Sequence, residues 1–168
     1  VNIITTIPKK NDYNISFTSN SINGKSFDFI LNGNVNVLAQ KRNAGASFFI
    51  NKRDRQAYDH NDDNFSELAE LKTNSFGANF FFKPKFNQKI DISISSLNEF
   101  RYGGEIVDKA PHLALQSEER IHNIIMGSVD YQIKFNENNS SFIAYLGGQL
   151  TDRDHYTGIF PDDIIDRN

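Results

Sequence analysis

The chain has 168 residues, the length of about one ordinary domain, and its 18 basic and 21 acidic residues give a formal net charge of −3. This near balance lacks the strongly basic character of nucleic-acid-binding domains, so we expect no nucleic-acid partner. Cysteine is absent, which excludes disulfides, thiolate metal sites and cysteine nucleophiles. The longest apolar runs, such as Phe80 to Phe82, are far too short for a transmembrane helix.

Apolar and polar residues alternate along much of the chain, which places two kinds of side chain on the two faces of extended strands. The run that starts at Phe27 continues for about thirteen residues, more than the five or six of a usual soluble strand and enough to span a membrane. In chain order the pattern predicts seven strands, over residues 13–21, 27–40, 46–51, 76–83, 90–95, 121–135 and 142–151. A helical pattern fits only residues 66–72, as a short turn within a loop.

The connections alternate in length. Residues 40–45, 84–88 and 136–140 form short connections, whereas residues 52–74, residues 102–119 and the tail from Arg153 form long polar ones. Consecutive antiparallel strands turn at opposite ends, so one end has short turns and the other has long loops, as in outer-membrane barrels. No eighth strand is evident in residues 153–168, and a bacterial barrel needs an even number. The predicted fold is therefore all-β: an antiparallel up-and-down transmembrane β-barrel, present in part as roughly seven strands of a larger plugged barrel.

Two other architectures fit the same alternation. A soluble antiparallel sandwich is also built from alternating strands, but its apolar faces meet each other in a dry interior instead of meeting lipid. A small complete barrel would require an eighth strand that the pattern does not reveal. The surroundings of the apolar face distinguish these alternatives.

An acidic segment, residues 59–70, has the spacing of a calcium-binding loop. Oxygen atoms at its first, third and fifth positions can converge on Ca²⁺, with a backbone carbonyl from the seventh and a bidentate carboxylate from the twelfth. Its sixth position, usually glycine, is Asn64, which tolerates the left-handed conformation better than most residues. We predict a Ca²⁺ site formed by Asp59, Asn61, Asp63, Phe65 and Glu70. The alternative is a solvated acidic loop.

Cationic and aromatic residues gather in or beside the long connections. Arginine and tyrosine there suit anionic or aromatic ligands, although salt bridges between loops are the plainer explanation. The candidate ligand-rim residues are Arg101, Tyr102, His112, Arg120, Arg153 and His155. The four histidines could form a haem or metal site, but they show no paired metal-ligand spacing. The alternative is that they are scattered, solvent-exposed residues. No catalytic motif is present, and we expect no enzyme.

Three segments resemble TonB-dependent outer-membrane receptors, especially those from Bacteroidetes. The opening Val1-Asn2-Ile3-Ile4-Thr5 resembles the last segment of their plug domain, which commonly reads Asn-Ile-Ile-Thr. The other two segments are residues 98–105, followed by Pro111-His112 and residues 118–120, and residues 150–158. The resemblance implies that residues 1–8 end a plug domain and that residues 9–168 form the N-terminal part of the barrel.

This resemblance implies a function in active import at the bacterial outer membrane. Such receptors bind a scarce nutrient, typically a ferric siderophore, haem, cobalamin or glycan, and admit it through the plugged lumen. Their partners are the lipid bilayer and the TonB complex, which acts through the plug. Polar residues such as Asn32, Asn34 and Asn36 would then face the lumen. The alternative function is a soluble calcium-binding β-sandwich module used in adhesion.

Overall fold

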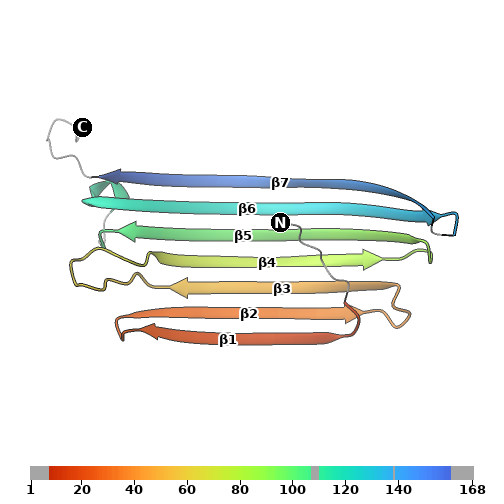
Figure 1. Ribbon diagram of the computed structural model, residues 1–168, viewed down its shortest axis with the longest axis horizontal. Coiled ribbons are helices and arrows are strands. Elements are labelled where there is room, and N and C mark those ends of the chain that lie inside the picture. Colours follow the sequence, from red (N-terminus) through yellow and green to blue (C-terminus); the bar gives the residue numbers. More distant parts are fainter. Residues whose placement is uncertain (1–7, 107–109, 138, 160–168) are drawn as a thin grey trace.

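The computed structural model describes residues 8–106, 110–137 and 139–159, which form one antiparallel sheet of seven strands (Figure 1). Each strand pairs with the next along the chain, so the topology is up-and-down. The strands are β1 (Asp12–Ile22), β2 (Ser26–Leu38), β3 (Ala44–Arg55), β4 (Glu70–Phe82), β5 (Gln88–Gly104), β6 (Gln116–Phe135) and β7 (Ser140–Ile159). A single 3₁₀ turn, η1 (Pro111–Leu113), lies between β5 and β6. Among these residues no helix is long and apolar enough to cross a membrane.

The sheet is a single open layer, so the all-β up-and-down prediction is confirmed but closure into a barrel is not shown. Six antiparallel pairings separate β1 from β7, and these two edge strands therefore run in the same direction. They could not close the sheet with an antiparallel pair. The described residues form no second sheet against this layer, such as the sandwich alternative requires.

Hydrophobic burial is very small for a chain of this length. Within the described ranges the buried hydrophobic side chains are Tyr58, Phe81 and Ala114, while most large apolar side chains are exposed. Ladder hydrogen bonds and lateral contacts between neighbouring strands hold the layer together instead. The edge-to-face pair of Phe48 and Phe80, with ring centroids 5.8 Å apart, is one such contact and contributes about 0.5–1.5 kcal/mol.

All seven predicted strands are present, but several are longer than predicted at the long-loop end. The predicted helical turn over residues 66–72 is wrong, because Leu68 forms a β-bridge with Tyr58 and β4 begins at Glu70, where Leu71 pairs with Arg101 of β5. The predicted tail is also wrong in part, because Arg153 lies inside β7, which continues to Ile159. The expected plug segment up to residue 7 and the tail over residues 160–168 lie outside the described residues.

Directly paired residues of neighbouring strands lie on the same face of the sheet. The register therefore shows which residues share each face, and the two faces differ in composition. We call one the apolar face, since exposed large hydrophobic side chains cover much of it. Its members include Tyr13, Ile15, Phe17, Val35, Phe48, Ile50, Phe76, Phe80, Ile92, Ile94, Ile125, Val129, Leu146 and Leu150. The opposite, polar face carries the asparagines and serines predicted to face a lumen, among them Asn32, Asn34, Asn36, Asp91, Ser93, Ser95, Ser128, Asp130 and Gln132.

The apolar face becomes polar at one row of paired residues. Across five strands this row reads Lys52, Asn74, Asn98, Asn123 and Asp152. The next row towards the short turns reads Ile50, Phe76, Ser96, Ile125 and Leu150. In β4 the apolar band therefore runs from Phe76 to Phe82, six steps along the strand or about 20 Å at about 3.3 Å per residue. The outward apolar band of transmembrane barrels is about 25 Å tall and is crossed by strands tilted about 35–45°, so the apolar run of β4 is shorter than a full crossing.

Candidate functional site

Residues 56–69, which connect β3 to β4 and which we call the acidic loop, are held in place at both ends. The backbones of Tyr58 and Leu68 form an isolated bridge, with N···O distances of 3.0 and 3.2 Å. The Tyr58 hydroxyl accepts a hydrogen bond from Asn23 Nδ2 at 2.6 Å, in the β1–β2 turn. Lys25 of that turn pairs with Asp62 at 2.6 Å, and this hydrogen bond raises the pKa of Lys25.

The far side of the acidic loop is fixed to the end of β5. Phe65 bridges to Glu105, and the Ser66 backbone N–H donates to the Gly104 carbonyl at 2.9 Å. Gly104 also donates its N–H to Ser66 Oγ at 3.0 Å. Gly104 has a φ of +106°, which L side chains rarely adopt, and a Cβ there would meet the backbone of Gln116. Glycine at this position therefore lets the acidic loop lie close to β5 and β6.

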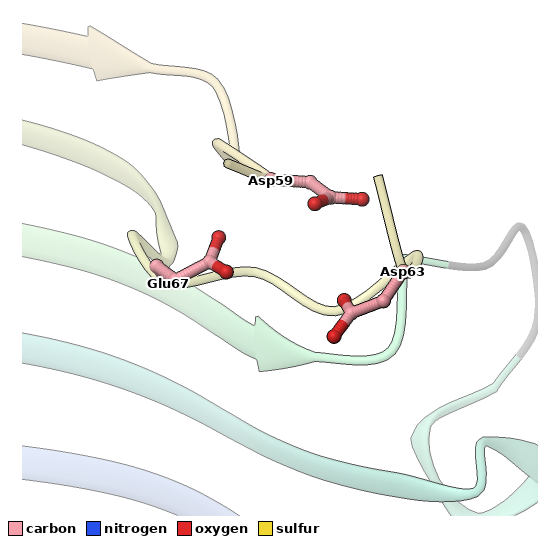
Figure 2. A group of neighbouring side chains, drawn as sticks. All are labelled: Asp59, Asp63 and Glu67. Atoms are coloured by element: carbon pink, nitrogen blue, oxygen red, sulfur yellow. The ribbon is translucent and has the colours of Figure 1, made fainter. Parts of the chain in front are cut away.

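Three carboxylates of the acidic loop converge (Figure 2). Asp59, Asp63 and Glu67 each place one oxygen within 4.8 Å of the others. Asp59 is half-buried and the other two are exposed. Hard oxygen donors from three carboxylates fit a hard divalent cation such as Ca²⁺.

The same carboxylates also accept hydrogen bonds from the loop backbone. Asp59 accepts the N–H groups of Asp62 and Asn64 at 2.7 and 2.8 Å. Partial burial opposes ionisation of Asp59, but these backbone donors outweigh it and hold its pKa below the ordinary value. Glu67 accepts the His60 N–H at 2.7 Å. Each carboxylate oxygen has more than one lone pair, so a cation could still bind to these groups.

Two of the five predicted calcium ligands, Asp59 and Asp63, lie together in the structure. Asp59 and Asp63 belong to the carboxylate group, and Asn61 Nδ2 donates to Asp63 at 2.9 Å. Asn64 has a φ of +70°, the left-handed conformation expected at the sixth position. Phe65 lies in the same loop and donates its N–H to Asp63 at 2.8 Å.

Glu70 is placed differently from the prediction. It is the first residue of β4, and its carboxylate pairs with Lys72 at 2.6 Å instead of joining the group. The structure brings Glu67 to the group in its place. Glu67 stands at the ninth position of the loop, which in calcium loops often binds through water, so the spacing itself contained a signal for it.

The predicted rim residues divide between the two faces and one loop. Arg101, Arg120 and His155 are paired in one transverse row on the polar face, and Arg153 is paired with His122 in the next row. Tyr102 follows Arg101 in the same strand and therefore faces the other way, where its hydroxyl donates to the Glu105 carbonyl at 2.8 Å. His112 is exposed and lies in η1.

Sequence reasoning missed other cationic residues on this part of the polar face. Arg53 and Arg55 lie at the end of β3. They were assigned to a long loop because alternation stops in β3 after Ile50, where the residues on both faces are polar. Pairing of Arg55 with Leu71, and of Leu71 with Arg101, places these arginines on the face that carries Arg101.

Two hollows lie along the polar face. One, of about 710 Å³, lies at the level of the apolar band and is lined by Asn34, Asn36, Asp91, Ser93, Asp130 and Pro8, among others. The other, of about 360 Å³, lies between the acidic loop and the ends of β5, β6 and β7. Arg101, Glu118 and Glu67 help to line it. The acidic loop and Arg101 therefore line one depression.

No protein-family model, curated protein or solved structure matches this chain. Membership of the receptor family is therefore a proposal supported by the residues and by the geometry of the sheet.

Proposed function

We propose that this chain forms part of the wall of a transmembrane β-barrel in the bacterial outer membrane, within a TonB-dependent receptor. The apolar band on one face of a single layer carries this proposal. Monomeric soluble proteins rarely expose a contiguous apolar surface of this extent. Hydrocarbon would cover it without a second sheet, and the boundary at Lys52, Asn74 and Asp152 would then lie near one membrane surface.

The strand connections support the same orientation. Short turns join β2 to β3, β4 to β5 and β6 to β7 at one end of the sheet, whereas the acidic loop and the segment with η1 lie at the other end, beside the short β1–β2 turn (Figure 1). Outer-membrane barrels have short periplasmic turns and longer extracellular loops. In this orientation the rim and the acidic loop face the extracellular medium.

The polar face would line the lumen. Its asparagines and serines hydrogen-bond laterally, as in the contact of 2.6 Å between the hydroxyl groups of Ser93 and Ser128. These side chains also expose donors and acceptors that a plug domain or water could use. Pro8 lines the larger hollow on this face, so the chain enters the sheet from the side where a plug would lie.

The receptor would import a scarce nutrient such as a ferric siderophore, haem or cobalamin, with energy from the TonB complex acting through the plug. The rim residues of the polar face would meet this ligand first. The soluble adhesion module requires a second sheet, and no observation on the described residues favours it.

We further propose that Ca²⁺ binds the acidic loop through Asp59, Asp63 and Glu67. Three carboxylates in close proximity repel one another, and a divalent cation would remove this repulsion. The acidic loop contacts both the end of β5 and the β1–β2 turn. A bound ion would therefore stiffen the extracellular opening.

Fractionation of cells that carry the full-length protein tests the proposed location. We expect the protein in the outer-membrane fraction, where it resists washing with urea and dissolves only in detergent, because its apolar band contacts lipid. Recovery of folded protein in the urea wash or in the soluble fraction would contradict the proposal.

A further inference from the structure

The loop-side end of the polar face carries a cluster of cationic side chains, which we call the arginine patch. It contains Arg53, Arg55, Arg101, Arg120 and Arg153, together with His122 and His155. One transverse row of paired residues runs from Arg55 through Leu71, Arg101 and Arg120 to His155. The next row runs from Arg53 through Thr73, Glu99 and His122 to Arg153. Residues far apart in the sequence are thus neighbours on one face.

The carboxylates of this region do not neutralise the patch. Asp28 pairs with Arg53 at 2.5 and 2.9 Å, and Glu118 pairs with Arg120 at 2.6 Å. In the part of the chain that the structure describes, Arg101 and Arg153 have no ion pair. Five arginines lie here beside four carboxylates, those of Asp28, Glu99, Glu118 and, across the hollow that Arg101 lines, Glu67, although the whole chain has a formal net charge of −3.

This arrangement lowers the stability of the bare sheet. Arg101 lies directly opposite Arg120, and like charges in that position destabilise a sheet. Arg120 Nε and His122 Nε2 are buried and have no hydrogen-bond partner among the described residues. A buried nitrogen without a partner carries a desolvation cost that an acceptor would remove. An anion with several oxygens beside Arg101 would reduce this repulsion.

Space for such an anion exists beside the patch. Arg101 is the cationic residue that lines the hollow of about 360 Å³, together with Glu118 of β6 and, on the opposite wall, Glu67 and Ala69 of the acidic loop. The Arg55 guanidinium donates to the Ala69 carbonyl at 2.9 and 3.1 Å, which fixes it at the edge of the same depression. Arg101 and Arg153 are both exposed, so their guanidinium groups are free to bind oxyanions in a bidentate manner.

We propose that the arginine patch binds a polyanionic group, with two or more carboxylates or phosphates, on the ligand of this protein. The inference rests on the proposed function in placing the patch at the lumen entrance. Anion binding itself does not require transport. The anion site and the proposed transport function can therefore be disproved separately.

Titration calorimetry on the full-length protein in detergent tests the patch. The probes are tripolyphosphate, butanetetracarboxylate and the uncharged sugar maltotriose. We expect saturable binding of one or both anions that weakens with added salt, and none of maltotriose. The anion that binds more tightly identifies phosphate or carboxylate as the recognised group. Absence of saturable binding by either anion would overturn the inference, whereas recovery in the outer membrane would leave the proposed function intact.

Charge variants locate the binding. Arg101→Gln and Arg153→Gln should each weaken anion binding by at least about tenfold, since each removes a charge-assisted hydrogen bond. Arg153→Lys keeps the charge and should restore most of the affinity. Lys134→Gln removes the same charge from the short-turn end of the polar face and should leave binding unchanged. Equal affinities of the Arg101→Gln and Lys134→Gln proteins, both with a native β-sheet circular dichroism spectrum, would also overturn the inference.

Discussion

Replacing Ile92 by arginine is expected to lower the free energy of unfolding of the full-length protein in a lipid bilayer by about 2–4 kcal/mol. Ile92 lies in β5 within the apolar band, where the register places Phe80 on one side and Val129 on the other. A guanidinium at this position would be in hydrocarbon. Urea titration of the protein folded into phospholipid vesicles measures the effect.

The neighbouring residue provides the matched control. Ser93 follows Ile92 in β5 but faces the polar side, where it contacts Ser128. Ser93→Arg should cost only about 1 kcal/mol, the value of the lost hydrogen bond, because the new charge would meet water. Equal costs at Ile92 and Ser93 would show that the two faces do not have different surroundings.

Replacing Glu67 by glutamine is expected to weaken Ca²⁺ binding by at least about tenfold, since the change removes one of three carboxylates from the group. Glu70→Gln should leave the affinity unchanged, because Glu70 pairs with Lys72 in β4. Titration calorimetry of Ca²⁺ into the full-length protein compares the two variants directly.

This pair of variants distinguishes the two possible ligand sets of the loop. Loss of affinity in the Glu70 variant, with the Glu67 variant unaffected, would restore the ligand set predicted from the twelve-residue spacing. If the unaltered protein gives no Ca²⁺ heat at millimolar metal, the three carboxylates serve only as hydrogen-bond acceptors for the loop backbone.

Sequence alone predicted the faces of the sheet well wherever one face is apolar. Phe27, Phe29, Leu31 and Val35 alternate with polar residues, and the structure places them on one face of β2 as expected. Period-two alternation fixes the facing of every residue in a strand, because a shift by one would exchange the faces. The short turns were predictable for the same reason, since they interrupt clear alternation.

The ends of the strands could not be predicted in this way. In β4 and β7 both faces are largely polar beyond the apolar band, so Glu70 and Arg153 leave no alternation signal although they lie in strands. The misplaced Glu70 and the divided rim follow from this error. Once β4 begins at Glu70, that carboxylate leaves the loop, and once Arg101 and Tyr102 share a strand, they must point to opposite faces.

Whether the sheet closes depends on groups that neither the pattern nor the described residues contain. β1 and β7 run in the same direction and have unpaired outer edges within the described sheet. Unpaired strand edges are not tolerated in hydrocarbon, because each free N–H and C=O group there costs several kcal/mol. In the proposed barrel both edges would therefore pair with further strands.

Collision measurements on spin labels along β5 test most directly whether the apolar face meets lipid. The chain contains no cysteine, so single-cysteine variants at residues 88–98 of the full-length protein in a bilayer can each carry one label. We predict that accessibility to oxygen peaks at Ile90, Ile92 and Ile94, and that accessibility to a water-soluble nickel chelate peaks at Asp91, Ser93 and Ser95. Low accessibility to both reagents at Ile92 and Ile94 would instead reveal a dry protein interior and contradict the proposed membrane wall.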